Sequence, residues 1–218
     1  MRRLRRWLRF YKYDMRFLPG EDETRRTGIV IAVRSPAVAF VSYRRLERRV
    51  LAINYKVAGE AEPRALVVLH GLSGELAGSR QRNFVSQLRA SCEWLEQAGG
   101  GLLVGDFNYV ACRAWRAAAE PLCSGDNALR ERAHWACDCC AAQPKGEQSL
   151  TVVGHTPESG VEWSRYATSG DGGWGAPTSM IDYALQTAGQ SWAWAGGVAA
   201  DYEVPRIDLR LRHQSDRY

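Results

Sequence analysis

The segment Gly105-Asp106-Phe107-Asn108 has the clearest chemical content in the chain, and it directly follows the apolar residues 102–104. Residues two apart in an extended chain project to the same side, so the Asp106 carboxylate and the Asn108 carboxamide face one way. The carboxylate can accept a hydrogen bond from water or face a metal ion, and the carboxamide can donate to a phosphate or carbonyl oxygen. The structural alternative is a turn by which the chain leaves the strand.

Three further titratable residues stand in or next to strand-like segments. Asp182 lies inside the apolar segment 180–183, where an ionised carboxylate needs a charged or strongly donating partner. Asp216 lies in the C-terminal sequence SDRY, and His70 ends the apolar run ALVVLH. Each also has a structural interpretation: Asp182 could pair with any nearby arginine, and His70 could cap a strand.

Taken in order, the GDFN segment, the S-x-I-D-Y strand from Ser179 and the S-D-x sequence near the C-terminus resemble the endonuclease/exonuclease/phosphatase superfamily. The resemblance begins at about Gly28, where GIVIAV looks like the family's glycine-led strand. It implies a four-layer α/β sandwich and Mg²⁺-dependent hydrolysis of a phosphoester by in-line attack of water. Endonuclease domains of retrotransposons without long terminal repeats are the most similar in style.

The resemblance implies a role for each of these residues. Asp106 would position or deprotonate the water and contribute to metal binding, and Asn108 would bond a phosphate oxygen. Asp182 would orient the catalytic side chain of the last motif, and Asp216 would lie on the metal side. His70 occupies a place where members carry a His or Tyr that reaches the phosphate.

Two features depart from the family pattern. The last family motif is S-D-H, and this chain has Arg217 at the third position, which stays charged and cannot act as a base or acid at neutral pH. Nothing upstream of Gly28 resembles the family's Asn-bearing strand, and Asp22-Glu23-Thr24, the look-alike of its Q-E-T motif, lies too close to the next strand. We therefore expect a domain that is incomplete at both ends, with Arg217 paired to Asp182.

These departures leave two functions open. One is an endonuclease-like, Mg²⁺-dependent phosphodiester hydrolase, with Mg²⁺ or Mn²⁺ bound weakly by Asp106 and Asp216. The other is a catalytically degenerate, nuclease-like domain that only binds nucleic acid. In either case the expected partner is nucleic acid, DNA more than RNA, and the chain is expected to be a monomer.

Two other classes fit less well. LVVLHGLSG resembles the oxyanion segment of α/β-hydrolases, but the chain has no G-x-S-x-G nucleophile elbow. Cysteines and one histidine crowd residues 123–140, yet their spacing does not match the paired C-x₂₋₄-C ligands of zinc sites. Thiols on an alanine-rich helix are the simpler interpretation of that segment.

The elements that must position the candidate residues follow from hydrophobic periodicity. Short β-branched runs bounded by turn residues predict strands, and apolar residues at helical spacing after Ser79 predict a helix that stops at Gly99. The predicted strands are 28–33, 37–41, 50–55, 65–69, 101–105, 150–153, 180–185 and 204–211, and residues 112–147 are expected to be largely helical. The fold class is α/β, a partial four-layer sandwich of two packed mixed β-sheets flanked by helices.

Composition and charge bound the remaining possibilities. The chain has 218 residues, 45% of them hydrophobic, which fits one globular domain without a membrane span. Residues 1–20 hold seven Arg and Lys against Asp14, while the rest of the chain is close to neutral. We expect residues 1–26 to form a basic arm and residues 27–218 to form the domain. The arm could be solvated, could contact phosphates or anionic headgroups, or could act as a transit peptide. Six cysteines without a secretory signal favour reduced thiols in the cytoplasm or nucleus.

Overall fold

The computed structural model describes residues 2–19, 28–71, 79–111, 123–134, 150–153, 165–168, 174–179 and 181–187. Its largest sheet has seven strands in the order β3-β4-β5-β6-β11-β8-β7. The strands are β3 (Val38–Glu47), β4 (Val50–Val57), β5 (Arg64–His70), β6 (Leu102–Asp106), β11 (Asp182–Thr187), β8 (Leu150–Val153) and β7 (Ala133–His134). β5 and β6 are parallel, as are β7 and β8, and the other neighbours are antiparallel.

The central strands are apolar on both faces because both faces are covered. Ala65, Val67 and Leu69 of β5 point into one core, and Leu66 and Val68 pack against a second core on the opposite face. A strand that alternates between two buried environments reads as a continuous apolar run, which is why ALVVL is so distinct in the sequence.

Helices α2 (Ser79–Gln97) and α3 (Ser124–Arg132) cover one face of the sheet. Parallel strands need a crossover connection, and α2 supplies it between β5 and β6. Phe84, Leu88, Cys92 and Leu95 recur at helical spacing and are almost fully buried against the sheet. The helix ends at Gln97, and Gly99, two residues later, has a positive φ of 75° that suits a residue without a side chain.

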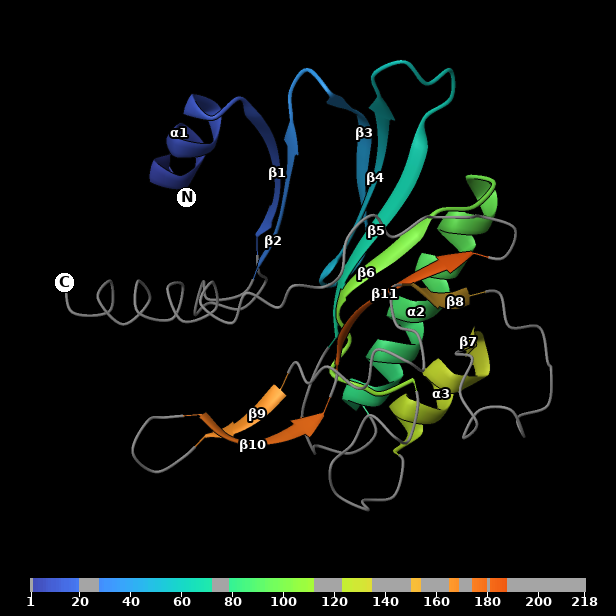
Figure 1. The fold of residues 1–218 in the computed structure, drawn as a ribbon. Coiled ribbons are helices and arrows are strands. Elements are labelled where there is room, and N and C mark those ends of the chain that lie inside the picture. Colours follow the sequence, from blue (N-terminus) through green and yellow to red (C-terminus); the bar gives the residue numbers. More distant parts are fainter. Residues whose placement is uncertain are drawn as a thin grey trace.

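An antiparallel hairpin covers the other face. β1 (Tyr13–Pro19) pairs along its whole length with β2 (Gly28–Arg34), and Ile29 and Ile31 pack against Leu51 and Ile53 of the large sheet. Helix α1 (Arg2–Phe10) lies outside this hairpin, so the order of layers is helix, hairpin, sheet and helices (Figure 1). The predicted class, an α/β partial four-layer sandwich, is confirmed.

Two short strands complete the described elements. β9 (Arg165–Thr168) pairs antiparallel with β10 (Trp174–Ser179) in a separate two-stranded sheet. No helix among the described residues has the length and apolar composition needed to cross a membrane.

The structure differs from the sequence analysis near the N-terminus. Most of the expected basic arm is folded, since residues 2–10 form α1 and residues 13–19 form β1. The boundary of the domain stays a prediction. The expected strand 204–211 lies outside the described residues, as does most of the expected helical segment 112–147, within which α3 and the two residues of β7 are described.

Candidate functional site

Three strands bring polar side chains to one edge of the large sheet. His70 is the last residue of β5 and lies opposite Asp106, the last residue of β6, in the parallel register. Asp182 is the first residue of β11 and lies opposite Asp106 in the antiparallel register. Leu69 and Leu185 belong to the core under α2, so alternation directs His70, Asp106 and Asp182 to the opposite face. We call these three residues the polar row.

Within the polar row, His70 and Asp106 are close but not hydrogen-bonded. The His70 Nε2 and Asp106 Oδ2 atoms are 4.0 Å apart, and about one third of each side chain is exposed. Burial lowers the pKa of His70 below its usual value; the Asp106 carboxylate opposes this shift, and the positive charge of Arg49 adds to it. The imidazole is therefore neutral at pH 7, with one nitrogen able to accept a proton and the other able to donate.

Two hydrogen bonds hold Asn108 next to the polar row, one to Asp106 and one to Gly71. Its backbone N–H donates to Asp106 Oδ1 at 2.9 Å, and its Nδ2 donates to the Gly71 carbonyl at 2.7 Å. Its φ of 57° lies in the left-handed region, which asparagine tolerates better than most residues. The turn interpretation of the Asp–Asn pair therefore holds. It is compatible with a chemical role, because one Nδ2 hydrogen and the Oδ1 atom are not used in this bond.

Gly105 permits the close approach of β5 and β6 beside the polar row. A Cβ atom there would lie 2.0 Å from the backbone oxygen of Leu69, and its φ is 144°. No other residue type fits this position without displacing backbone. The family-like glycine before Asp106 thus has a packing reason in this chain.

Asp126 is a residue that sequence reasoning missed. It is fully buried on α3, and its two carboxylate oxygens accept from the backbone N–H groups of Val110 at 2.8 Å and Cys123 at 2.9 Å. The bond to Cys123 caps the start of α3, and the bond to Val110 ties the chain two residues after Asn108 to that helix. An acidic residue in the first turn of a predicted helix was the available signal.

Arg49 is the second residue that the sequence analysis missed. It ends the turn between β3 and β4 with a φ of 58°, and its carbonyl accepts from the backbone N–H of His70 at 3.0 Å. Its charge affects the imidazole of His70, so a cation borders the polar row. Arginine is common in this chain, and nothing in the local sequence ERRV distinguishes Arg49.

The structure thus brings together His70, Asp106, Asn108 and Asp182. The other two candidate residues, Asp216 and Arg217, lie outside the described residues, and so does the expected Asp182–Arg217 pair. The roles of all six remain predictions. Cys123 is half-buried, and the other members of the cysteine-rich segment are not described except for the backbone of His134.

Comparisons with known proteins bear on the fold. The sequence matches no protein-family profile and no curated protein. Among solved structures, the 3′ phosphatase NExo from Neisseria, bound to a product DNA hairpin, is similar with a TM-score of 0.56. The sequence identity is 16%, and the match covers 84% of this chain and 70% of NExo. The sulfate-bound catalytic domain of human Nocturnin is similar with a TM-score of 0.53 and a sequence identity of 13%. That match covers 84% of this chain and 64% of the Nocturnin domain.

A retrotransposon enzyme is among the similar structures. The endonuclease domain of TRAS1, a telomere-specific non-LTR retrotransposon, gives a TM-score of 0.50 and 13% identity over 80% of this chain and 67% of that domain. The chain therefore spans about two thirds of the length of these structures. At such identities the likeness concerns the fold, and together with the layer order and the strand register it identifies the chain as having the fold of the endonuclease/exonuclease/phosphatase superfamily.

Proposed function

We propose that the edge formed by the polar row and Asn108 binds and hydrolyses a phosphodiester, with nucleic acid as the substrate class. One observation carries this proposal: His70, Asp106 and Asp182 lie in register on adjacent strands although 36 and 76 residues separate them along the chain. A neutral imidazole, two carboxylates and a carboxamide are the acceptors and donors that hydrolysis of a phosphoester needs. The similar structures include a phosphatase and an endonuclease domain, which supports the same class of reaction.

Each side chain has a role that suits its contacts. The Asp106 side chain is about one third exposed, so water can reach it, and its carboxylate can orient a water molecule and accept its proton during attack on phosphorus. The neutral His70 can donate a hydrogen bond to a phosphate oxygen. Asn108 can donate its second Nδ2 hydrogen to the same phosphate while the first stays on Gly71.

The donor set also fits Mg²⁺, though only as a weak site. Mg²⁺ prefers oxygen ligands and often takes one or two carboxylates, with waters and substrate phosphate completing the octahedron. Asp106 and Asp182 would hold it, with Asp216 as the further proposed ligand. Among the described residues no three His, Cys, Asp or Glu side chains gather into a metal-binding group. When bound, the ion would neutralise phosphate charge and lower the pKa of water.

Arg217 favours a second candidate function, binding without turnover. A guanidinium in place of the family imidazole can hold a phosphate but cannot exchange a proton near pH 7. Losing one acid–base group typically lowers a rate about 10²–10⁴-fold. We therefore expect hydrolysis to be slow. If the loss of the acid–base group abolishes hydrolysis altogether, the domain only binds nucleic acid.

A single-turnover assay separates these functions. The protein is mixed in excess with end-labelled DNA and Mg²⁺, and cleavage and binding are followed for the unchanged chain, for Asp106→Asn and for Glu93→Gln. Glu93 is an exposed carboxylate on α2 and serves as the matched control. Hydrolysis that is lost by at least about 10²-fold in Asp106→Asn, and kept in Glu93→Gln, supports the hydrolase. Equal rates in all three proteins would exclude the polar row as the site, and binding without any cleavage would support the second function.

A further inference from the structure

A basic recess lies where α1, β1 and β3 meet. It has a volume of about 360 Å³, and its lining includes Arg5, Arg9, Tyr13, Asp14, Arg16 and Tyr43. This volume lies within the range of about 300–1,000 Å³ that is usual for ligand pockets. None of these residues belongs to the polar row, so the recess is a separate feature of the molecule.

The recess has an excess of positive charge. Arg16 is paired with Asp14 at 3.0 Å, whereas Arg5 and Arg9 form no ion pair with any part of the chain that the structure describes. Their i, i+4 spacing puts both on one face of α1, and like charges at that spacing destabilise a helix. An anion held between them would remove this repulsion, so the arrangement favours a negatively charged ligand.

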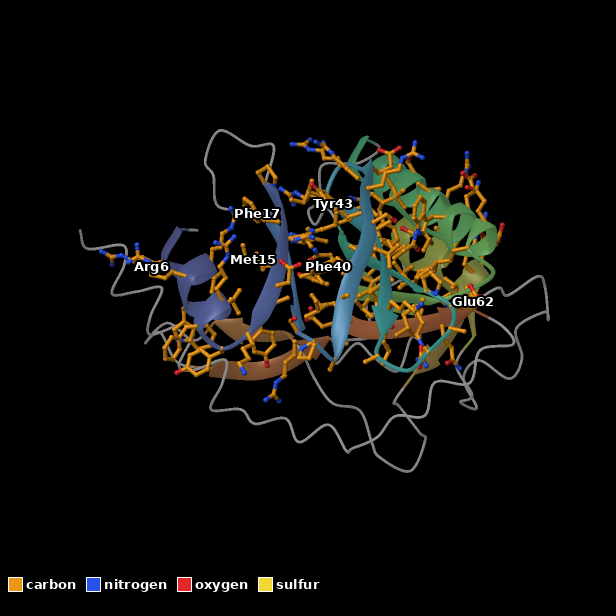
Figure 2. The ribbon with its side chains drawn as sticks, turned by 90° about the horizontal axis from the view of Figure 1, so that it is seen from above. Arg6, Met15, Phe17, Phe40, Tyr43 and Glu62 are labelled. Atoms are coloured by element: carbon orange, nitrogen blue, oxygen red, sulfur yellow. The ribbon has the colours of Figure 1, made fainter. Side chains whose placement is uncertain are left out.

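Arg16 is fixed in a position from which it can contribute. Its guanidinium lies 4.6 Å from the centre of the Phe40 ring and 5.5 Å from that of Tyr43, two side chains that project from β3 toward the hairpin (Figure 2). It donates through Nη1 to Asp14 and to the Met15 carbonyl. A guanidinium held by rings and hydrogen bonds loses little freedom when it binds a phosphate.

Exposed aromatic rings lie on the same helix and just after it. Trp7, Phe10 and Tyr11 are 57%, 80% and 51% exposed, and the Tyr11 ring contacts the other two with centres 4.7 and 5.1 Å away. Nucleic acid bases stack on such rings, while adjacent arginines hold the backbone. Phe10, the most exposed of these rings, directly follows Arg9 and lies one helical turn after Arg6.

We propose that α1 and the basic recess form a binding site for single-stranded nucleic acid, with phosphates on Arg5, Arg9 and Arg16 and a base stacked on Phe10. An anionic membrane surface is the competing ligand for a basic helix with aromatic residues. Two observations favour nucleic acid. The arginines line a recess that a flat surface would not enter, and Leu8, on the apolar side of α1, is already buried in the protein.

Fluorescence anisotropy tests the site independently of hydrolysis. The full chain is titrated into a labelled single-stranded DNA oligonucleotide in EDTA, at salt concentrations from about 50 to 200 mM. We expect the double variant Arg5→Ala/Arg9→Ala to bind at least tenfold more weakly, and its slope of log affinity against log salt to fall by about 1.4, because each phosphate contact to a single strand contributes about 0.7. The matched control Lys56→Ala/Arg89→Ala removes two exposed charges elsewhere and should stay within about twofold.

A second variant distinguishes stacking from charge. Phe10→Ala should weaken binding roughly tenfold while leaving the salt slope unchanged. Circular dichroism of every variant shows whether the fold is kept. Equal affinity of the Arg5→Ala/Arg9→Ala variant and the control would overturn the proposal. So would sedimentation of the chain with phosphatidylserine vesicles without any affinity for the oligonucleotide.

Discussion

Replacing Asp126 should destabilise the protein far more than replacing any exposed carboxylate. The side chain is fully buried, and each of its oxygens accepts from a different backbone N–H, that of Val110 or that of Cys123. Asp126→Ala removes the acceptor of one buried donor, the Val110 N–H, and of one half-buried donor, the Cys123 N–H. An unsatisfied buried donor costs about 1–3 kcal/mol and a half-buried one less, so the free energy of unfolding should fall by about 2–5 kcal/mol. That is a large part of the total of about 5–15 kcal/mol for a domain.

Asp126→Asn gives an intermediate test of the same reasoning. The carboxamide keeps one acceptor oxygen but puts an NH₂ group against the other donor, so we expect roughly half the loss, about 1–3 kcal/mol. Glu131→Gln is the matched control, because it also removes one negative charge from α3 but at an exposed position. Its free energy of unfolding should stay within about 0.5 kcal/mol of that of the unchanged protein. Urea unfolding followed by circular dichroism measures all three variants.

Amide hydrogen exchange adds a local readout. The N–H groups of Val110 and Cys123 should exchange faster in Asp126→Asn, since each depends on one carboxylate oxygen. The reasoning would be refuted if Asp126→Ala unfolded at the same urea concentration as Glu131→Gln, or if exchange at the two amides did not change.

Three further expectations concern the edge of the sheet. Gly105→Ala should prevent folding or cost several kcal/mol in thermal unfolding, because its Cβ would lie 2.0 Å from the Leu69 oxygen; a fully stable variant would contradict this close approach. In an NMR titration the pKa of His70 should lie below about 6.5, fall further in Asp106→Asn and rise in Arg49→Ala, and opposite shifts would contradict the charge arrangement. Because the pKa of His70 is lower in the folded than in the unfolded protein, the unfolded state binds more protons below about pH 6.5. The free energy of unfolding should therefore decrease as the pH falls below about 6.5. Unfolding curves at several pH values should show a weaker pH dependence for His70→Gln.

The sequence predicts the central strands well because burial on both faces gives them an unbroken apolar pattern. The run ALVVL and the helical spacing of Phe84, Leu88 and Leu95 both correspond to elements whose side chains fill the two cores. Local periodicity was sufficient there, since each residue's environment repeats with the period of its element.

The N-terminal segment was harder to predict because its charge hides its periodicity. In YDMRFLP, Asp14 and Arg16 occupy strand positions on the face toward the large sheet, where a charged residue is not expected. The structure accommodates them by their mutual ion pair and by stacking of Arg16 on Phe40 and Tyr43. The two ring contacts are made with a strand more than 20 residues away, which no local pattern reveals.

The sequence indicated which residues form the candidate site, but not which strands pair to place them next to each other. Motif order indicated that Asp106, Asn108 and Asp182 belong together, and the pairing of β6 with β11 brings the two carboxylates opposite each other. That pairing closes a loop of more than 70 residues, so it depends on the whole fold. Asp126 was missed for a related reason, because a buried capping carboxylate and a solvated one look the same in sequence.

The central claim is that the polar row is a site of phosphodiester hydrolysis, and single-turnover cleavage of labelled DNA by the unchanged chain and by Asp106→Asn tests it most directly. We expect slow, Mg²⁺-dependent cleavage by the unchanged chain and a rate at least about 10²-fold lower for Asp106→Asn at unchanged fold and DNA binding. Cleavage at the same rate by both proteins, or no cleavage by the unchanged chain above the level of buffer with Mg²⁺, would contradict the claim.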